Sequence, residues 1–263
     1  MSGVAVPVMG DSAGTGAGRR APGTGPAPGR ESQRSGCRTD PLADTIGSVT
    51  QPLPTAVDAL TELMAGNHRF IENMREHPNQ DAHRRAQLAQ GQRPWALIFG
   101  CADSRVAAEI IFDRGLGDLF VVRTAGHVVD GGVLGSIEFG VAVLEIPLIV
   151  VLGHDSCGAV RATLEAFESG EMPPGYLRNV VELVTPSVIS ADRKGSRAIE
   201  AVVAEHTLNT ARLLTTKSAA IARRVDEGSC AVVAMEYALS DGEVRVLGTV
   251  PDGLAARTVV TGQ

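Results

Sequence analysis

Three strand-length runs of mostly apolar residues, each followed by a helix-like segment, constrain the fold of this chain more than any other feature. They read "WALIFGC" from Trp95, "DLFVVRTAG" from Asp118 and "PLIVVLGH" from Pro147. The segments after them, "VAAEIIFD", residues 133–145 and "GAVRATLEAFESG", are typical of helices. Strands that are apolar on both faces belong to parallel sheets covered by helices on both sides. The pattern predicts an α/β fold with a central, mainly parallel β-sheet flanked by helices.

Further helices are expected on either side of this alternation. Val57 and Leu60 recur at helical spacing after Thr55, whose hydroxyl can cap the first turn, and residues 81–90 also have a helical pattern. We therefore expect an N-terminal helical arm before the sheet. Residues 176–224 are predicted to be largely helical. The stretch "CAVVAMEYALSDGEVRVLG" then predicts a strand, an Asp-Gly turn and a short edge strand.

The beginning of the chain differs in composition from the rest. Residues 1–50 contain no Phe, Trp or Tyr and are rich in Gly, Pro and Ser. Such a segment cannot bury enough apolar surface to offset the entropy lost on ordering. We expect a disordered N-terminal extension over residues 1–50, in which Cys37 is an unligated thiol, and a single domain over residues 51–263.

Composition excludes several classes of partner. A net charge of −6 and an aromatic content of 3% supply neither the basic surface nor the stacking platforms that nucleic-acid binding uses. No apolar run approaches the roughly eighteen residues of a membrane span. With four cysteines and no hydrophobic leader, a disulfide framework is not expected, and we place the chain in a reducing cytoplasm. Cys230 is expected to be a structural core cysteine.

Two cysteines and a histidine stand at the ends of predicted strands. Cys101 closes the first strand, and His154 and Cys157 stand at the end of the third. In an open α/β sheet, ligands bind beyond the carboxyl ends of the strands, so the fold can bring these distant residues together. Two thiolates and one imidazole form a zinc-binding set and match the three protein ligands of catalytic zinc sites. The sequence therefore predicts one Zn²⁺ per chain.

Asp103 and Arg105 follow the first of these cysteines. Asp103 is a candidate fourth ligand, which would close the site, but the guanidinium of Arg105 can hold its carboxylate away as a bidentate pair. Zinc with two thiolates and a neutral imidazole is formally neutral and needs hydrogen bonds that favour the anion in order to activate water. We expect Asp103 to accept that hydrogen bond while Arg105 holds it in place. An Asp103-ligated, inactive state at low pH remains an alternative.

The combination of "CADSR" and "GHDSCGA" resembles the signature of the β-class carbonic anhydrases. The resemblance runs from about Ala56 to Gly248 and includes "LFVVRTAG" and "GSIEFGV". It implies an α/β fold, a dimer or a higher assembly of dimers with N-terminal helices embracing the partner, and reversible hydration of carbon dioxide to bicarbonate and a proton. It also implies a zinc site and a catalytic dyad. The ligands are then Cys101, His154 and Cys157, and the dyad is Asp103 with Arg105.

Four further residues are assigned to substrate binding by the same resemblance. The Gly158 amide is the expected substrate-binding N–H, and Gln92 matches a glutamine that binds substrate across the dimer interface. Phe120 matches an apolar wall residue of the pocket, and Val106 is a second candidate for that wall. An apolar wall suits carbon dioxide, which carries no charge and no net dipole.

Three positions depart from the family pattern. Phe139 replaces a tyrosine, so any role of that hydroxyl is absent. His127 replaces an asparagine and is either a proton shuttle at the pocket mouth or a structural histidine with satisfied hydrogen bonds. Ile98 stands where the allosteric branch has a tryptophan, so we expect the inhibitory bicarbonate site to be missing.

Two other functions compete with this interpretation. The same fold and metal could hydrolyse a related small molecule such as carbonyl sulfide or carbon disulfide, a choice that depends on pocket shape. A non-catalytic structural zinc protein would also explain two cysteines and a histidine. It would not explain Arg105, which competes for the candidate fourth ligand.

Overall fold

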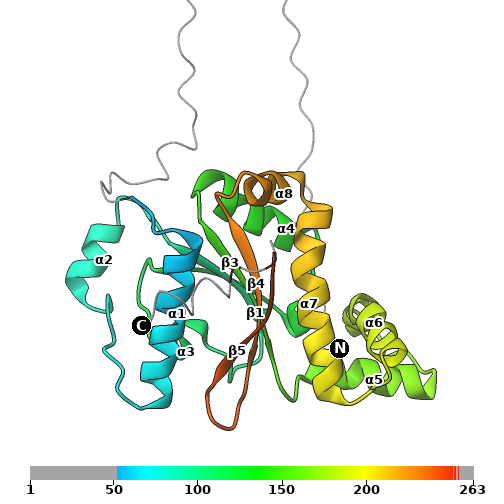
Figure 1. Cartoon of the computed structure of the whole chain (residues 1–263). Coiled ribbons are helices and arrows are strands. Elements are labelled where there is room, and N and C mark those ends of the chain that lie inside the picture. Colours follow the sequence, from blue (N-terminus) through cyan, green and yellow to red (C-terminus); the bar gives the residue numbers. More distant parts are fainter. Residues whose placement is uncertain (1–51, 251, 253, 255–263) are drawn as a thin grey trace, which may run out of the picture. The chain divides into compact units, whose positions relative to one another are not determined.

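A five-stranded sheet of order β2-β1-β3-β4-β5 forms the centre of the structure, a computed structural model that describes residues 52–250, 252 and 254. The strands are β1 (Ala96–Cys101), β2 (Leu119–Thr124), β3 (Leu148–His154), β4 (Ala231–Tyr237) and β5 (Val244–Val250). The first four are parallel, and β5 pairs antiparallel with β4 (Figure 1). The α/β fold and the final hairpin are confirmed. The predictions for residues 1–50 lie outside the described residues.

Helices connect the strands in the predicted order. They are α1 (Ala56–Ile71), α2 (Ala82–Leu88), α3 (Ala108–Ile111), α4 (Gly131–Glu138), α5 (Gly158–Ser169), α6 (Leu177–Arg193), α7 (Ile199–Lys217) and α8 (Ala219–Asp226). A π-helical turn (Phe139–Val143) extends α4. Thr55 caps α1 in a capping box with Asp58, and Gly170 ends α5 in the left-handed conformation that favours glycine.

Successive strand residues enter two cores on opposite faces of the sheet. Leu97, Phe99 and Ile149 pack with residues of α4, α7 and α8, whereas Ile98 and Val150 pack with residues of α1 and α3. Figure 1 shows α1 and α3 on one side of the strands and α7 on the other. This alternation explains the near-continuous apolar runs, because both faces of β1 and β3 are buried.

Two sequence expectations need correction. The helix after β1 was expected over "VAAEIIFD" but spans only Ala108–Ile111, because Ala107 is extended and Asp113 takes a positive φ of 47°. Strand β2 is only half-buried rather than covered on both faces, since it forms one edge of the described sheet. Its Arg123 is exposed. Neither difference changes the order of the elements.

The strand order creates a switch point between β1 and β3. The chain leaves β1 for β2 on one side and then crosses back to form β3 on the other side of β1. Connections on the two sides of such a point diverge and leave room beyond the carboxyl ends of the two strands. Cys101 and His154 are the last residues of these strands. The topology therefore places them beside each other at the position where α/β proteins bind ligands.

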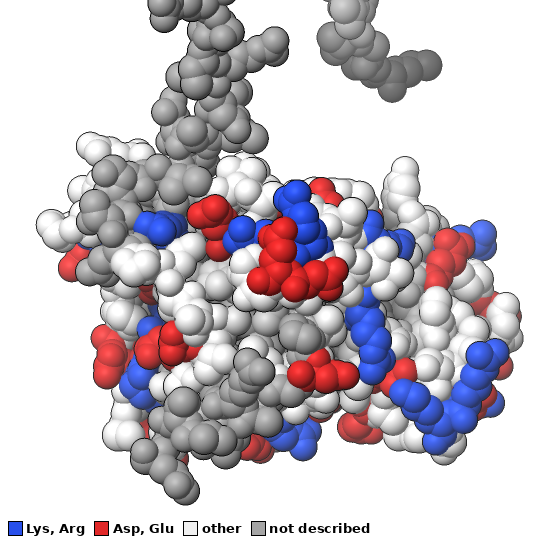
Figure 2. Space-filling model, turned by 45° about the horizontal axis from the view of Figure 1, so that its top comes forward, with Lys and Arg blue, Asp and Glu red and all other residues white. Residues whose placement is uncertain are grey.

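Two surface properties of the described residues bear on partners. No helix among them is long and apolar enough to cross a membrane. On the face seen in Figure 2, acidic and basic side chains are interspersed.

Candidate metal centre

Cys101, His154 and Cys157 meet at the carboxyl ends of β1 and β3. Each offers one ligand atom, and these atoms all lie within 4.8 Å of one another in a buried position. The two sulfur atoms are 4.0 Å apart. A tetrahedral zinc ion with Zn–S bonds of about 2.3 Å places two sulfurs roughly 3.8 Å apart. The spacing of the thiols therefore fits a shared zinc ion.

The ring of His154 has one satisfied nitrogen and one free nitrogen. Nδ1 lies 2.7 Å from the backbone oxygen of Asp155, which can only accept, so Nδ1 carries the proton. In the neutral ring Nε2 then carries the free lone pair, and it is buried without a hydrogen-bond partner among the described residues. An unpartnered buried nitrogen is costly, whereas a histidine that donates from one nitrogen to a carbonyl and ligates through the other is the usual metal-binding arrangement. The donor set fits zinc.

The electrostatics of the site favour a thiolate at Cys101. The hydrogen bond shared with Cys157 lowers the pKa of Cys101 and raises the pKa of Cys157, because the first negative charge disfavours a second. The backbone N–H of Gly126 also donates to the Cys101 sulfur, at 3.3 Å. A divalent cation between the two sulfurs would relieve their repulsion and allow both to ionise.

Asp103 and Arg105 form the predicted pair beside the ligands. Nε of Arg105 donates to one carboxylate oxygen at 2.9 Å and Nη2 to the other at 2.7 Å, with the Arg105 amide adding a third bond at 3.0 Å. These hydrogen bonds hold the pKa of Asp103 well below its usual range, so the carboxylate stays ionised. The geometry is the bidentate pair that restrains Asp103.

Arg123 fixes the segment that carries both Cys101 and Asp103. Its Nε donates to the Cys101 carbonyl at 2.8 Å and its Nη2 to the Asp103 carbonyl at 2.5 Å. The sequence interpretation assigned no role to this residue. The available signal was a single guanidinium inside the otherwise apolar run "LFVVRTAG", next to the first metal-ligand strand.

Comparison with known families agrees with this geometry. A family model described as "Carbonic anhydrase" matches residues 96–244, which include all three candidate ligands and the Asp103–Arg105 pair. The chain belongs to the carbonic anhydrase family. As a member of this family it is an enzyme, with carbonate dehydratase as its class.

Relatives and solved structures place this carbonic anhydrase in the β class. Carbonic anhydrase 2 of Mycobacterium tuberculosis is 54% identical over 73% of this chain and 92% of its own length. A carbonic anhydrase of Mycolicibacterium smegmatis is 52% identical over 74% of this chain and 95% of its own. The Coccomyxa β-carbonic anhydrase in complex with acetazolamide has a TM-score of 0.56 and 27% identity, covering 62% of this chain and 75% of that one. Tetrameric β-carbonic anhydrases from Sordaria macrospora give a TM-score of 0.57 and 26% identity, covering 64% and 87%.

The four residues predicted to bind substrate lie in different surroundings in this carbonic anhydrase. Gly158 is exposed at the first position of α5, directly after Cys157. Val106 is only 2% exposed and packs into the core that contains α1 and α3. Phe120 lies on β2 opposite Leu97, four residues before the level of Cys101, and packs on Phe139. Gly158 therefore lies next to a candidate ligand, and the substrate-binding roles of all four residues stay predictions.

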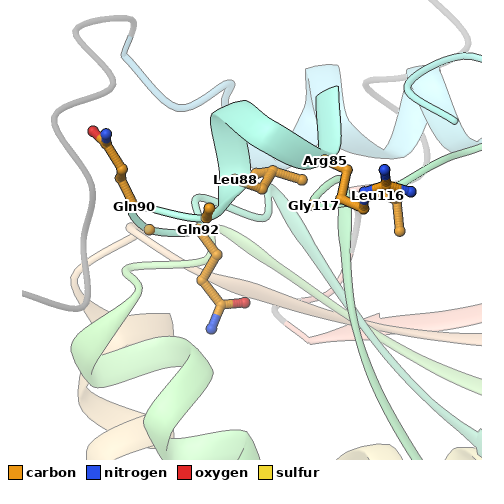
Figure 3. A pocket seen from close by; sticks show the side chains of 8 residues that line it. Arg85, Leu88, Gln90, Gln92, Leu116 and Gly117 are labelled. Carbon is orange, nitrogen blue, oxygen red and sulfur yellow. The ribbon is translucent and has the colours of Figure 1, made fainter. Parts of the chain in front are cut away.

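Gln92 lines a hollow of about 720 Å³ beside α2, and none of the three candidate metal ligands is among its lining residues. The other lining residues are Arg85, Leu88, Ala89, Gln90, Gly91, Leu116 and Gly117. The Gln92 side chain points away from α2 (Figure 3). No residue of α2 is buried, although helices of this kind normally bury one face.

The structure corrects the interpretation of His127 as a shuttle at the pocket mouth. The residue is 0% exposed, and both ring nitrogens lack a hydrogen-bond partner. Burial lowers its pKa well below the usual value, so the ring is neutral and does not lie at a solvent-exposed pocket mouth. The structure supports a buried structural role instead, in which the ring packs edge-on against Phe99 and beside His206. Ile98 is fully buried, and Cys230 lies in the core, where burial raises its pKa to about 12.

Proposed function

We propose that the chain is a zinc-dependent carbonic anhydrase that catalyses the reversible hydration of carbon dioxide to bicarbonate and a proton. The observation that carries this proposal is the joint geometry of the site. Two thiols and a free imidazole nitrogen converge at the switch point, beside a carboxylate that a guanidinium restrains. Membership in the carbonic anhydrase family supports the same reaction.

In this proposal Cys101, His154 and Cys157 hold one Zn²⁺. The ion, when bound, supplies the positive charge that makes water acidic enough to attack carbon dioxide near neutral pH. The carbonyl of Asp155 keeps the proton of His154 on Nδ1 and leaves Nε2 for the metal.

Asp103 orients the attacking water. Because its pKa is held low by Arg105, the carboxylate accepts a proton in a hydrogen bond and directs a lone pair of the water oxygen toward the substrate carbon. Arg105 keeps the carboxylate from moving onto the metal. The inactive state with Asp103 as fourth ligand requires this bidentate pair to break.

The substrate pocket is proposed to be completed by a second copy of the chain. Gly158 offers an amide directly after Cys157, while Gln92 lines a hollow whose lining includes none of the candidate ligands. The unburied α2 and the hollow beside Gln92 are surfaces that a partner subunit would cover. We propose a dimer or a tetramer, acting in the reducing cytoplasm where the three described cysteines remain free thiols.

Metal analysis and stopped-flow carbon dioxide hydration on the purified full chain test the proposal. We expect about one zinc per chain and hydration activity. Cys157→Ser should lose both, while Cys230→Ser, which changes a buried thiol outside the site, should keep both. Zinc-loaded protein without hydration activity would identify a structural zinc protein. Faster turnover of carbonyl sulfide or carbon disulfide than of carbon dioxide by the same preparation would show that hydrolysis of these compounds is the main reaction.

A further inference from the structure

A chain of buried hydrogen bonds connects α6 and α7 to the sulfur of Cys101. Ser187 of α6 lies 3.1 Å from Nδ1 of His206 on α7, and Nε2 of His206 lies 2.8 Å from the carbonyl oxygen of Gly126. The amide of Gly126 donates to the Cys101 sulfur. We call this series Ser187–His206–Gly126–Cys101 the His206 relay. Every residue in it is buried, and the sequence interpretation assigned no role to Ser187 or His206.

The partners of His206 define its protonation. A carbonyl oxygen only accepts, so Nε2 carries the proton and donates it to Gly126. Nδ1 therefore accepts from the Ser187 hydroxyl. Asn209 donates to the oxygen of Ser187 at 3.3 Å, which leaves the Ser187 proton free to point at His206. Burial lowers the pKa of His206, in agreement with a neutral ring.

Gly126 needs an external partner to hold its orientation. It has a φ of +62°, and a Cβ there would lie 2.7 Å from the Cβ of Ala159, so only glycine fits this turn. His127 follows with a φ of +39°, a left-handed conformation that is unfavourable for a residue with a side chain. Without His206, the buried Gly126 carbonyl would lose this hydrogen-bond partner, which is unfavourable in the protein interior and favours a change in the turn.

We propose that His206 is a positioning residue of the metal centre: by holding the Gly126 carbonyl, it aims the Gly126 amide at the Cys101 sulfur. The N–H···S hydrogen bond stabilises the thiolate and withdraws electron density from it. The relay thereby sets how strongly Cys101 donates to the metal. This inference deepens the proposed function and rests on it only in taking Cys101 as a metal ligand.

The test compares His206→Gln with His206→Leu in the full chain. The side-chain amide nitrogen of glutamine can take the place of Nε2 and donate to Gly126, whereas leucine fills space without donating. Zn²⁺ affinity is measured by competition with a chromophoric chelator, and Co²⁺-substituted protein reports on thiolate donation through its sulfur-to-cobalt charge-transfer band. Loss of an outer partner of a metal ligand typically weakens metal binding by about 10–100-fold.

We expect His206→Leu to bind zinc at least about tenfold more weakly and to shift the cobalt band, and His206→Gln to restore both toward wild type. His127→Asn is the matched control, since it alters a buried imidazole 4.5 Å away that has no hydrogen bond, and asparagine tolerates a positive φ. Folded His206→Leu with wild-type affinity and spectrum would overturn the proposal. Wild-type protein that binds neither metal would instead overturn the proposed function.

If His206→Leu does not fold, the wild-type protein decides the question alone. In protein loaded with NMR-active cadmium, the Gly126 amide should show scalar coupling to the metal across the N–H···S bond. His206 should show the tautomer with its proton on Nε2. Absence of the coupling, or a proton on Nδ1, would contradict the relay.

Discussion

Asp103–Arg105 and Asp113–Arg69 are both aspartate–arginine ion pairs, but they differ in the parts of the chain that they connect. Asp103 accepts three hydrogen bonds, and all of them come from Arg105, two positions away. Asp113 also accepts three, but from Arg69 and from the amides of Glu76 and His77, which lie 36 to 44 positions away. The side chain of Asp113 is 1% exposed and that of Arg69 20%, whereas Asp103 is 18% exposed and Arg105 53%.

The difference lies in what each pair joins. Asp113 connects α1 and the segment after it to the turn behind α3, so its hydrogen bonds exist only when the chain is folded. The hydrogen bonds that the Asp103 carboxylate accepts come from Arg105 alone among the described residues, and this pair can also form in an unfolded chain. A local pair that contributes little to the tertiary structure, yet stands beside three candidate metal ligands, is best explained by chemistry. The long-range pair is best explained by stability.

The largest expected effect is on turnover. Asp103→Asn replaces the proton-accepting oxygen with an amide and should lower the carbon dioxide hydration rate by at least about a hundredfold. Zinc content and thermal midpoint should change little, because the pair is local and partly exposed. Stopped-flow assays and metal analysis measure both quantities. An Asp103→Asn variant that loses its zinc or fails to fold would contradict the assignment of Asp103 to chemistry rather than to stability.

The second expected effect is on stability. Asp113→Asn removes the charge of a buried carboxylate, leaves the partly exposed Arg69 without its charged partner and should lower the free energy of unfolding by about 1–3 kcal/mol. Hydration activity per folded molecule should stay within a few-fold of wild type. Urea denaturation of zinc-loaded protein gives the first quantity, with Asp103→Asn as the control. Equal loss of stability in the two variants would refute the contrast.

The smallest expected effect is on the acid dependence of folding. Burial alone would raise the pKa of Asp113, but hydrogen bonds from Arg69, Glu76 and His77 outweigh it and lower the pKa. A lowered pKa in the folded state adds stability above the unfolded value of about 4, which is lost as pH falls through the folded pKa. The stability difference between wild type and Asp113→Asn should therefore shrink below about pH 4. Denaturant titrations in the acid range measure this stability difference. A difference that grows in acid would contradict the lowered pKa of Asp113 in the folded protein.

Sequence reasoning found the parts of the site that are local. The apolar runs predicted β1 and β3, and the motifs around Cys101 and His154 predicted the candidate ligands that the fold brings together. The Asp103–Arg105 pair was accessible for the same reason, since two positions of separation already determine the contact.

The missed parts depend on contacts between distant segments. Arg123 reaches Cys101 only because β2 pairs with β1, and His206 reaches Gly126 across 80 positions. No local pattern distinguishes His206 from an ordinary polar residue on a helix, and the single guanidinium in the run "LFVVRTAG" marks Arg123 without indicating which residues it contacts. The error at His127 has the same origin. A histidine after a glycine suggests an accessible turn, whereas α7 in fact covers it.

The adjacency of β1 and β3 has a consequence for how the molecule is made. His154 follows Cys101 by 53 positions, and the chain forms β2 on the far side of β1 between them. A cation can therefore meet all three candidate ligands only after the crossover has been synthesised and the long-range pairing of β1 with β3 has formed. Bound metal should then stabilise the completed fold and slow its unfolding far more than it speeds its folding.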